Sequence, residues 1–411
     1  MKRIKRSFTF FCLLIGLLGL MGCSSPSSLS ETNIVVTEEK QDVETKVKET
    51  AQGQIEEPSD CIDWKDLLHE GTMELLYADK FSVDYYEGGY RLLTITDGTR
   101  LLTIPEGREV PENLDPDIIP LKQPMKDIYL VASAAMDMFV ELDALESISL
   151  SGQKEENWYV PEAKEAMARG DMVYAGKYNK PDYELILAKG CSLAIENMMI
   201  SHSPEVIDKL EGFDIPVMIE YSSYESHPLG RVEWIKFYGA LLGKEELAES
   251  IFAEQIEIIE RVSADEKTDK TIAFFFITSN GLVQVRRTTD YVPKMIELAG
   301  GKYIYESLGE EESSRSTMNV QLEEFYNSAK DADYLIYNSS IDGGVDSIEA
   351  LLDKSGILAD FEALKNGNVW CTTNDMYQQS MSIGALIEDI HKILMDESIA
   401  DEELQYLFRL N

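Results

Sequence analysis

The loop around Arg231 combines residue types that bind anions and metal complexes. Arg231 follows residues 228–230 (Pro-Leu-Gly), where a loop is expected to turn into a helix, and Glu225 and His227 lie just before it. A guanidinium in this position pairs bidentately with a carboxylate or with the acidic periphery of a metal chelate. The alternative is a structural ion pair between Arg231 and Glu225 that fixes the loop. His227 is a candidate ligand of iron or cobalt, although a lone histidine before proline more often serves as a structural hydrogen-bond donor.

A second pair of cations, Arg286 and Arg287, stands at the end of a predicted strand and follows Gly281. Neighbouring side chains of a strand point to opposite faces, so at most one of these arginines is expected to enter a binding cleft. The simplest arrangement binds an anionic ligand between Arg231 on one side and Arg286 or Arg287 on the other.

Aromatic rings in loops offer the other half of such a site. Tyrosine and tryptophan rings stack on a macrocycle or on a catecholate, and ordinary packing is the alternative for each of them. The candidates in predicted loops are Trp158, Tyr159, Tyr174, Tyr178, Tyr224 and Tyr377.

The sequence contains no motif of the common enzyme classes. There is no G-x-S-x-G elbow, no H-E-x-x-H pair, no Walker loop and no G-x-G-x-x-G after a predicted strand. We therefore expect no catalytic residue and no resident metal or cofactor. A site for a bare divalent metal is weakened because such sites use several histidines with Asp or Glu, and the four histidines are scattered. They are His69, His202, His227 and His391.

The elements that must position these residues begin with a β-rich segment and continue as strands alternating with helices. Residues 72–130 are expected to be rich in β-structure, with turns at 85–90 and 97–98. Strand–helix alternation with short connections predicts right-handed βαβ units and mostly parallel sheets. In the first series we expect strands at 128–132, 147–150, 193–196 and 217–220, and helices at 134–145, 161–169, 183–189 and 204–210.

A long amphipathic pattern separates this series from a second one. Residues 244–262 place Leu247, Ile251, Phe252 and Ile259 on one stripe of a helix. The second series predicts strands at 271–277, 283–286, 334–337 and 369–372, and helices at 291–298, 322–330, 348–352, 361–366, 383–394 and 402–407. The predicted fold class is α/β, with two lobes of mostly parallel sheets bridged by one long α-helix and a ligand cleft between the lobes.

The first residues indicate export and lipid attachment. Basic residues at 2–6 precede an apolar run at 8–20, which is too short for a membrane span of about 20 residues and fits a signal-peptide core. The run ends in Leu-Met-Gly-Cys at 20–23, which resembles a bacterial lipobox, so Cys23 is the expected lipidation site. An ordinary signal peptide followed by a chance cysteine is the alternative.

We predict six segments along the chain. Residues 1–22 form the leader, 23–60 a flexible polar tether, and 61–127 a β-rich N-terminal extension packed on the first lobe. Residues 128–243 form the first lobe, 244–263 the bridging helix and 264–411 the second lobe.

Composition excludes several kinds of partner. The 411 residues include 37 Lys+Arg and 75 Asp+Glu, for a net charge of −38. Such an acidic chain is not expected to bind nucleic acid, nor to lie on anionic lipid through a basic face. Cys61, Cys191 and Cys371 are odd in number and widely spaced, so we expect buried small hydrophobes rather than a disulfide framework.

With these features the chain resembles the substrate-binding lipoproteins of bacterial ABC importers that capture ferric siderophores, haem and cobalamin. The resemblance covers about residues 125–395 and rests on the order lobe, helix, lobe, and on the strings YAGKYNKPDYE at 174–184 and ESHPLGR at 225–231. It implies a monomer that is lipid-anchored on the outer face of the cytoplasmic membrane, or is periplasmic if the cell has two membranes. It also implies capture of an iron-siderophore, haem or cobalamin, in that order of expectation, and delivery to a permease driven by a separate ATPase.

The resemblance further implies a docking surface for the permease. Such receptors carry one glutamate on each lobe, which docks onto permease arginines. Glu184 stands seven residues before Cys191, and Glu324 stands seven before Asp331, each near the start of a predicted helix. The family more usually has Pro-Asp at the positions of residues 191–192, which are Cys-Ser here. The alternative is that each carboxylate is only stabilised by the helix dipole.

Two other functions remain open at this point. A divalent-metal importer receptor has the same helix-bridged fold, and a tethered two-lobe body also suits a surface adhesion or scaffolding lipoprotein. Binding of a soluble ligand distinguishes an importer receptor from an adhesion protein.

Overall fold

The computed structural model describes residues 62–265, 267–309, 316–339 and 344–411. Residues 60–411 form one compact unit. Among the described residues, no helix has the length and apolarity that a membrane crossing needs. The predicted leader and tether, with Cys23 and Cys61, lie outside the described residues.

The chain first forms a five-stranded sheet, which we call the N-terminal sheet. Its strands lie in the order β1-β2-β3-β4-β5, and β5 pairs parallel to β4 while the other pairs are antiparallel. The predicted turn at 85–90 is confirmed, and Gly88 and Gly89 there have φ angles of 84° and 85°, which suit glycine. The strands are β1 (His69–Thr72), β2 (Phe81–Tyr86), β3 (Tyr90–Ile95), β4 (Arg100–Ile104) and β5 (Ile118–Lys122).

The first lobe is a parallel sheet in the order β12-β11-β6-β7-β8, with a small β9-β10 ribbon beside it. The helix predicted at 134–145 is shorter than expected, because Asp143 takes a left-handed φ of 49° after it. The strands are β6 (Ile128–Leu130), β7 (Ile148–Ser151), β8 (Val173–Tyr174), β9 (Gly176–Lys177), β10 (Lys180–Pro181), β11 (Leu193–Glu196) and β12 (Val217–Ile219). The helices are α1 (Met136–Glu141), α2 (Pro161–Arg169), α3 (Tyr183–Lys189) and α4 (Pro204–Glu211).

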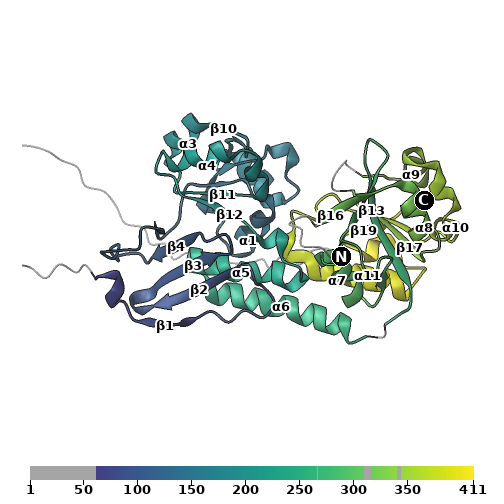
Figure 1. The fold of residues 1–411 in the computed structure, drawn as a ribbon, viewed down its shortest axis with the longest axis horizontal. Helices are drawn as coiled ribbons and strands as arrows, with labels where there is room; N and C mark the ends of the chain where they lie inside the picture. Colours follow the sequence, from purple (N-terminus) through teal and green to yellow (C-terminus); the bar gives the residue numbers. More distant parts are fainter. Residues whose placement is uncertain (1–61, 266, 310–315, 340–343) are drawn as a thin grey trace, which may run out of the picture. The chain divides into compact units, whose positions relative to one another are not determined.

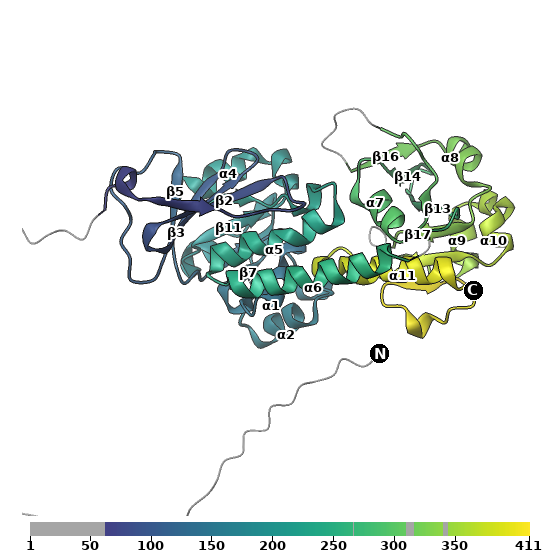
Figure 2. The same cartoon turned by 90° about the horizontal axis from the view of Figure 1, so that it is seen from below.

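Two long helices follow, α5 (Pro228–Leu242) and α6 (Glu245–Ser263). Nearly every residue of α5 is buried, because the N-terminal sheet packs against it through contacts such as Phe81 with Trp234, whose ring centroids are 4.9 Å apart. Gly239 permits the close approach of α6, since a Cβ there would lie 2.6 Å from the Ala248 methyl group. Helix α6 extends from the first lobe to the second, where it packs against α11, and it is the predicted bridge (Figures 1 and 2).

The second lobe is a mixed sheet in the order β16-β14-β13-β17-β18-β19, with β15 paired to β13. Strands β13, β17 and β18 are parallel and buried on both faces, as expected for the centre of an α/β sheet. The strands are β13 (Thr271–Ile277), β14 (Val283–Arg286), β15 (Lys302–Tyr303), β16 (Thr317–Val320), β17 (Tyr334–Tyr337), β18 (Val369–Thr372) and β19 (Leu407–Arg409). The helices are α7 (Tyr291–Leu298), α8 (Leu322–Ala329), α9 (Ile348–Lys354), α10 (Glu362–Lys365) and α11 (Ile383–Met395).

One predicted helix is wrong. Residues 402–407 do not form an α-helix, but a 3₁₀ turn (Asp401–Glu403) followed by β19, which is antiparallel to β18. The buried Asp389 carboxylate accepts hydrogen bonds from the Gln405 and Tyr406 amides, which holds this segment extended. The predicted fold class is otherwise confirmed: two α/β lobes with parallel strands at their centres are bridged by one long helix.

The described cysteines are as predicted. Cys191 and Cys371 are both buried. Burial raises the pKa of the Cys191 thiol to about 11, so it stays protonated at neutral pH.

Candidate functional site

A cavity of about 310 Å³ lies where the two lobes and the N-terminal sheet meet. The N-terminal sheet contributes the residue before β2 and the turn after β3. The first lobe contributes the loops after β11 and β12, and the second lobe contributes residues between β14 and α7 and the residue before β16. The lining residues are Lys80, Thr96, Met198, Tyr221, Ser223, Tyr224, Glu225, Ser226, Thr289, Asp290 and Ser316.

Hydroxyl groups dominate the lining, because seven of these side chains are Ser, Thr or Tyr. The two carboxylates are already engaged. Glu225 accepts hydrogen bonds from Trp234 Nε1 (3.0 Å) and from the Asp79 and Lys80 amides. Asp290 pairs with Arg286 at 3.5 Å and caps α7. Burial raises the pKa of both carboxyl groups, although the hydrogen bonds and the ion pair act to lower it. Because both carboxyl groups are engaged, the cavity offers hydroxyls rather than free carboxylates.

Arg231 and Arg286 lie close together beside this cavity, on either side of the boundary between α5 and the second lobe. The Cζ atom of Arg231 is 4.0 Å from the ring centroid of Tyr291, and that of Arg286 is 5.7 Å from the same centroid. Arg286 also donates to the Tyr377 hydroxyl. Two guanidinium groups from different parts of the chain therefore share one buried tyrosine ring.

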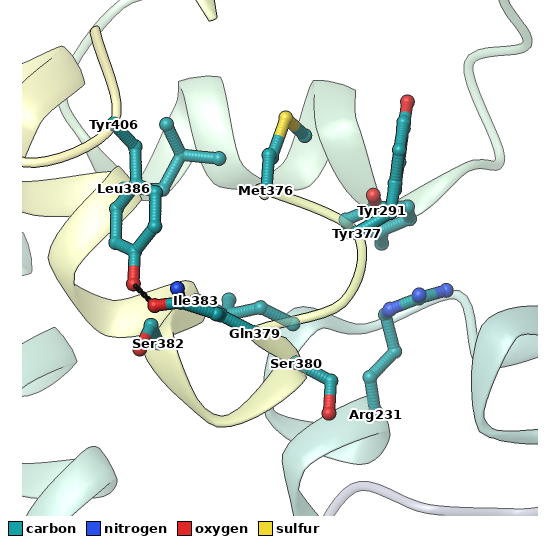
Figure 3. A pocket seen from close by; sticks show the side chains of 10 residues that line it. All are labelled: Arg231, Tyr291, Met376, Tyr377, Gln379, Ser380, Ser382, Ile383, Leu386 and Tyr406. Carbon is teal, nitrogen blue, oxygen red and sulfur yellow. Dashed lines mark hydrogen bonds between the residues drawn. The ribbon is translucent and has the colours of Figure 1, made fainter. Parts of the chain in front are cut away.

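Arg231 stands out because no acidic side chain of the described residues forms a salt bridge with it, although its charge acts on the buried Glu220 and Asp290. The side chain is 5% exposed, it makes no hydrogen bond with the described residues, and its Nε is fully buried. Figure 3 shows it among residues 376–383 of the second lobe, around a space of only about 10 Å³. Such a space holds at most one water molecule, whereas the neighbouring 310 Å³ cavity has room for a larger molecule.

Glu225 and His227, which precede Arg231 in the sequence, make contacts other than those expected for them. Glu225 does not pair with Arg231, so the structural ion pair considered from the sequence is wrong. The His227 ring stacks on Tyr77 (4.5 Å), and its Nδ1 accepts a hydrogen bond from the Leu229 amide as the N-cap of α5. Burial lowers the pKa of His227, which favours the neutral ring. Its role here is that of an acceptor, not the structural donor expected from the sequence.

Of the remaining candidates, Tyr224 and Tyr377 lie at the cavity or at the arginine cluster, whereas the others make contacts elsewhere. Arg287 donates to the Gly309 carbonyl (2.9 Å), away from the Arg286 cluster. Tyr224 lines the 310 Å³ cavity, and Tyr377 lies beside Arg286. Trp158 is 0% exposed and donates to Ser151 Oγ (3.1 Å), so in this structure it presents no ring face to a ligand. Tyr178 packs on the core of the first lobe instead of lining this cavity.

A strap from the second lobe, residues 378–381, is tied to the first lobe by four hydrogen bonds. They run from the Tyr159 amide to Gln378 Oε1 (2.7 Å), from Gln378 Nε2 to the Asn157 carbonyl (2.8 Å), from Ser380 Oγ to the Ala134 carbonyl (2.7 Å) and from the Met381 amide to Asp137 Oδ2 (2.9 Å). Nothing in the sequence pattern signals this strap, because its partners are more than 200 residues away. It holds the lobes together next to the arginine cluster.

The loop before β2 is held by two buried carboxylates that sequence reasoning did not connect with it. Glu233 accepts hydrogen bonds from the amides of residues 76–78, at 2.8 to 3.1 Å, and Glu225 accepts from those of residues 79 and 80. Glu225 lies just before α5, and Glu233 lies within its first half. Gly230 permits this contact, since a Cβ there would lie 2.9 Å from the Tyr77 carbonyl oxygen. The N-terminal sheet is thereby fixed to the cavity wall.

Replacing Glu233 by alanine is expected to lower the free energy of unfolding by about 3 kcal/mol. The change leaves three amides without their buried acceptor, and each orphaned donor costs about 1–3 kcal/mol before relaxation. Urea unfolding measures the effect. The control is Glu254→Ala on the exposed side of α6, for which a change within about 0.5 kcal/mol is expected. Equal, small effects of the two substitutions would contradict the proposed anchoring role.

The two glutamates implicated in docking occupy equivalent positions in the two lobes. Glu184 lies in the first turn of α3 and Glu324 in the first turn of α8, and both are exposed. Helix α3 leads into β11, the parallel neighbour of the first-lobe strand β6. Helix α8 leads into β17, the parallel neighbour of β13. Each helix therefore precedes the equivalent strand of its lobe.

Comparison of the sequence with known proteins finds similar lipoproteins. No family model matches the chain. Two similar proteins of Methanocaldococcus jannaschii are named uncharacterized lipoproteins, MJ0878 (23% identical over 370 residues, 84% of this chain and 86% of that protein) and MJ0872 (24% identical over 355 residues, 83% and 88%). The match with MJ0878 covers 84% of this chain. The residues that follow the N-terminal sheet, 123–411, are a smaller share of the chain, so the match extends into that sheet.

Solved structures share the two-lobe body. The haem-binding protein HutB of Vibrio cholerae matches 66% of this chain and 99% of its own, with 16% identity and a TM-score of 0.53. A periplasmic haem-binding protein of Pseudomonas aeruginosa matches 70% and 99%, with 14% identity and a TM-score of 0.53. An Fe³⁺-hydroxamate transport protein of Saccharomonospora viridis matches 66% and 94%, with 18% identity and a TM-score of 0.51. The chain therefore has the fold of these two-lobe binding proteins, and about a third of it lies outside the shared part.

Proposed function

We propose that this chain is the receptor of an ABC importer, anchored outside the cytoplasmic membrane by a lipid on Cys23, and that it captures a ferric complex between its lobes. The observation that carries the proposal is the hydroxyl-lined cavity of about 310 Å³ between the lobes, next to the buried Arg231 and Arg286. A binding site between two domains is the usual location for a small ligand. The receptor acts as a monomer and hands its ligand to a permease with a separate ATPase.

The chemistry of the lining favours a ferric siderophore over haem or cobalamin. Catecholate and hydroxamate chelates expose oxygen atoms, which Ser, Thr and Tyr hydroxyls bind by hydrogen bonds. Haem and cobalamin present large planar faces that need more apolar wall.

A thermal-shift screen tests this assignment. The unit of residues 60–411 is mixed with ferric catecholates, ferric hydroxamates, haem, cobalamin or free divalent metals. A ligand at 100 times its dissociation constant stabilises the folded state by about 2.7 kcal/mol, which raises the melting temperature by about 5 °C.

The pattern of response distinguishes the alternatives. A response to ferric chelates supports the proposal, whereas a response to haem, cobalamin or a bare metal alone reassigns the receptor to that ligand. Silence across the panel would contradict the capture of these ligands and favour the adhesion or scaffolding function.

Replacing Arg231 by alanine is expected to weaken binding of an anionic ferric chelate by more than about tenfold. The Arg231 charge already acts on groups of the cavity, because it opposes the rise of the Asp290 and Tyr224 pKa values that burial causes. A unit charge about 8 Å from an anion, at an effective dielectric constant of about 20, contributes about 2 kcal/mol. The melting temperature should not fall, because the lost stacking on Tyr291 is offset by removing a buried charge that forms no salt bridge within the described part of the chain.

Titration calorimetry with a ferric catecholate measures the change in affinity. Arg287→Ala is the matched control, since this arginine bonds to Gly309 away from the cluster, and its affinity should stay within about twofold of the wild type. Unchanged affinity of Arg231→Ala would remove Arg231 from the site.

A further inference from the structure

We propose that the N-terminal sheet is the third wall of the ligand site and that Lys80 on this wall binds an anionic group of the ligand. The inference rests on the proposed function and adds to it the charge class of the ligand. It also assigns a binding role to the part of the chain that precedes the two-lobe body.

The sheet reaches the cavity at two points. Lys80 immediately precedes β2, and Thr96 begins the turn between β3 and β4. Both residues line the cavity together with Thr289 and Ser316 of the second lobe and with Tyr221 and Tyr224 of the first. A ligand in this cavity is therefore in reach of three separate parts of the fold.

The wall is built rigidly. Five successive amides, of residues 76–80, donate to the Glu233 and Glu225 carboxylates, which are 0% and 2% exposed. Hydrogen bonds to buried charged acceptors are stronger than neutral ones. Trp234 Nε1 fixes Glu225 in turn. The backbone of Lys80 is thus held by the same carboxylate that lines the cavity.

The charges around the cavity favour an anion. Its two carboxylates, Glu225 and Asp290, are occupied by the donors described above. Among the described residues the Lys80 ammonium group pairs only with Asp79 (2.6 Å), whose side chain is 66% exposed. An exposed ion pair of this kind is weak, so Lys80 can exchange it for an anionic group of a ligand at little cost. Arg231 adds positive charge next to the cavity, whereas the charge of Arg286 is balanced by Asp290, in a chain whose net charge is −38.

Part of this chain has no counterpart in the solved two-lobe proteins. About two thirds of it spans those proteins almost completely, whereas the match with the archaeal lipoprotein MJ0878 covers 84% of it and extends into the N-terminal sheet.

Calorimetric titration of the full chain in detergent tests the inference with two probes, an anionic ferric tris-catecholate and an uncharged ferric hydroxamate. The test variant is Lys80→Gln, which removes the charge and keeps a polar side chain. Lys122→Gln is the matched control, because Lys122 lies on β5 of the same sheet, is exposed and does not line the cavity.

Lys80→Gln is expected to weaken the catecholate by about tenfold or more and the hydroxamate by less than about twofold, with an unchanged melting temperature. Lys122→Gln should bind both probes as the wild type does. Equal affinities of wild type and Lys80→Gln for the catecholate would overturn the inference, as would a wild type that binds only the hydroxamate, and both results would leave the proposed function intact. A wild type that binds neither probe would overturn the siderophore assignment and this inference together.

Discussion

Replacing Glu196 by glutamine is expected to stabilise the folded chain increasingly as the pH rises, by about 4 kcal/mol between pH 5 and pH 8. Glu196 is the last residue of β11, is 0% exposed, and neither carboxyl oxygen has a hydrogen-bond partner among the described residues. Burial without compensation raises its pKa to about 8, from an ordinary value of 4.5. The folded chain therefore holds this proton at neutral pH.

The direction of the effect follows from proton linkage. Between pH 4.5 and about 8 the folded chain keeps a proton that the unfolded chain has lost, so the free energy of unfolding falls as the pH rises. The slope is about 1.4 kcal/mol per pH unit and ends above the folded-state pKa. Glutamine has nearly the same shape and no charge to desolvate, so the variant lacks this slope.

Urea unfolding at pH 5, 7 and 9 measures the difference between the wild type and Glu196→Gln. The control is Glu211→Gln on the exposed end of α4 in the same lobe, whose stability should follow that of the wild type at each pH. Parallel curves for the wild type and Glu196→Gln would show that Glu196 is ionised in the folded chain, and would contradict this prediction.

Reversing both docking glutamates, with Glu184→Lys and Glu324→Lys together, is expected to reduce ligand uptake by more than about tenfold while leaving ligand affinity unchanged. If Glu184 and Glu324 face permease arginines, as the family resemblance implies, each substitution turns an attractive contact into a repulsive one, and like charges brought together at an interface cost several kcal/mol. Both positions are exposed first-turn positions of helices, so the change should not disturb folding.

Uptake of radio-iron supplied as the ferric chelate, in cells whose only receptor is this chain, measures the effect. The control combines Glu205→Lys and Glu349→Lys, which change the same charge on exposed first-turn residues of α4 and α9. If both double variants lower uptake equally, the loss reflects net charge, and the specific docking role is wrong.

The elements whose bounds were predicted to the residue are those with strong local signals. Helix α3 begins after the Asp182 cap and ends before Gly190, and β13 is an apolar run flanked by polar residues. The predicted helix at 402–407 failed because its acidic start is a common helix signal. The deciding contact, with the Asp389 carboxylate, comes from a helix earlier in the chain. Local patterns cannot reveal such a contact.

In the candidate site, too, contacts between residues that are far apart in the sequence were not predicted. A pairing of Arg231 with either Arg286 or Arg287 is the simplest arrangement for binding an anion from both lobes, and the structure brings Arg286 rather than Arg287 to the Tyr291 ring. The role of the loop before β2 was not foreseen, since its amides bond to a glutamate up to 157 residues away. Trp158 was assigned to a loop correctly, but no local pattern shows that its ring is enclosed by the first lobe.

The central claim is that a ferric complex binds between the two lobes, and a crystal structure of the chain grown with a ferric catecholate tests it most directly. The anomalous scattering of iron locates the metal independently of the protein coordinates. The account predicts one iron peak per chain in the cavity lined by Lys80, Tyr224 and Thr289. An iron peak elsewhere on the surface, or no peak in crystals of a chain saturated with the complex, would contradict it.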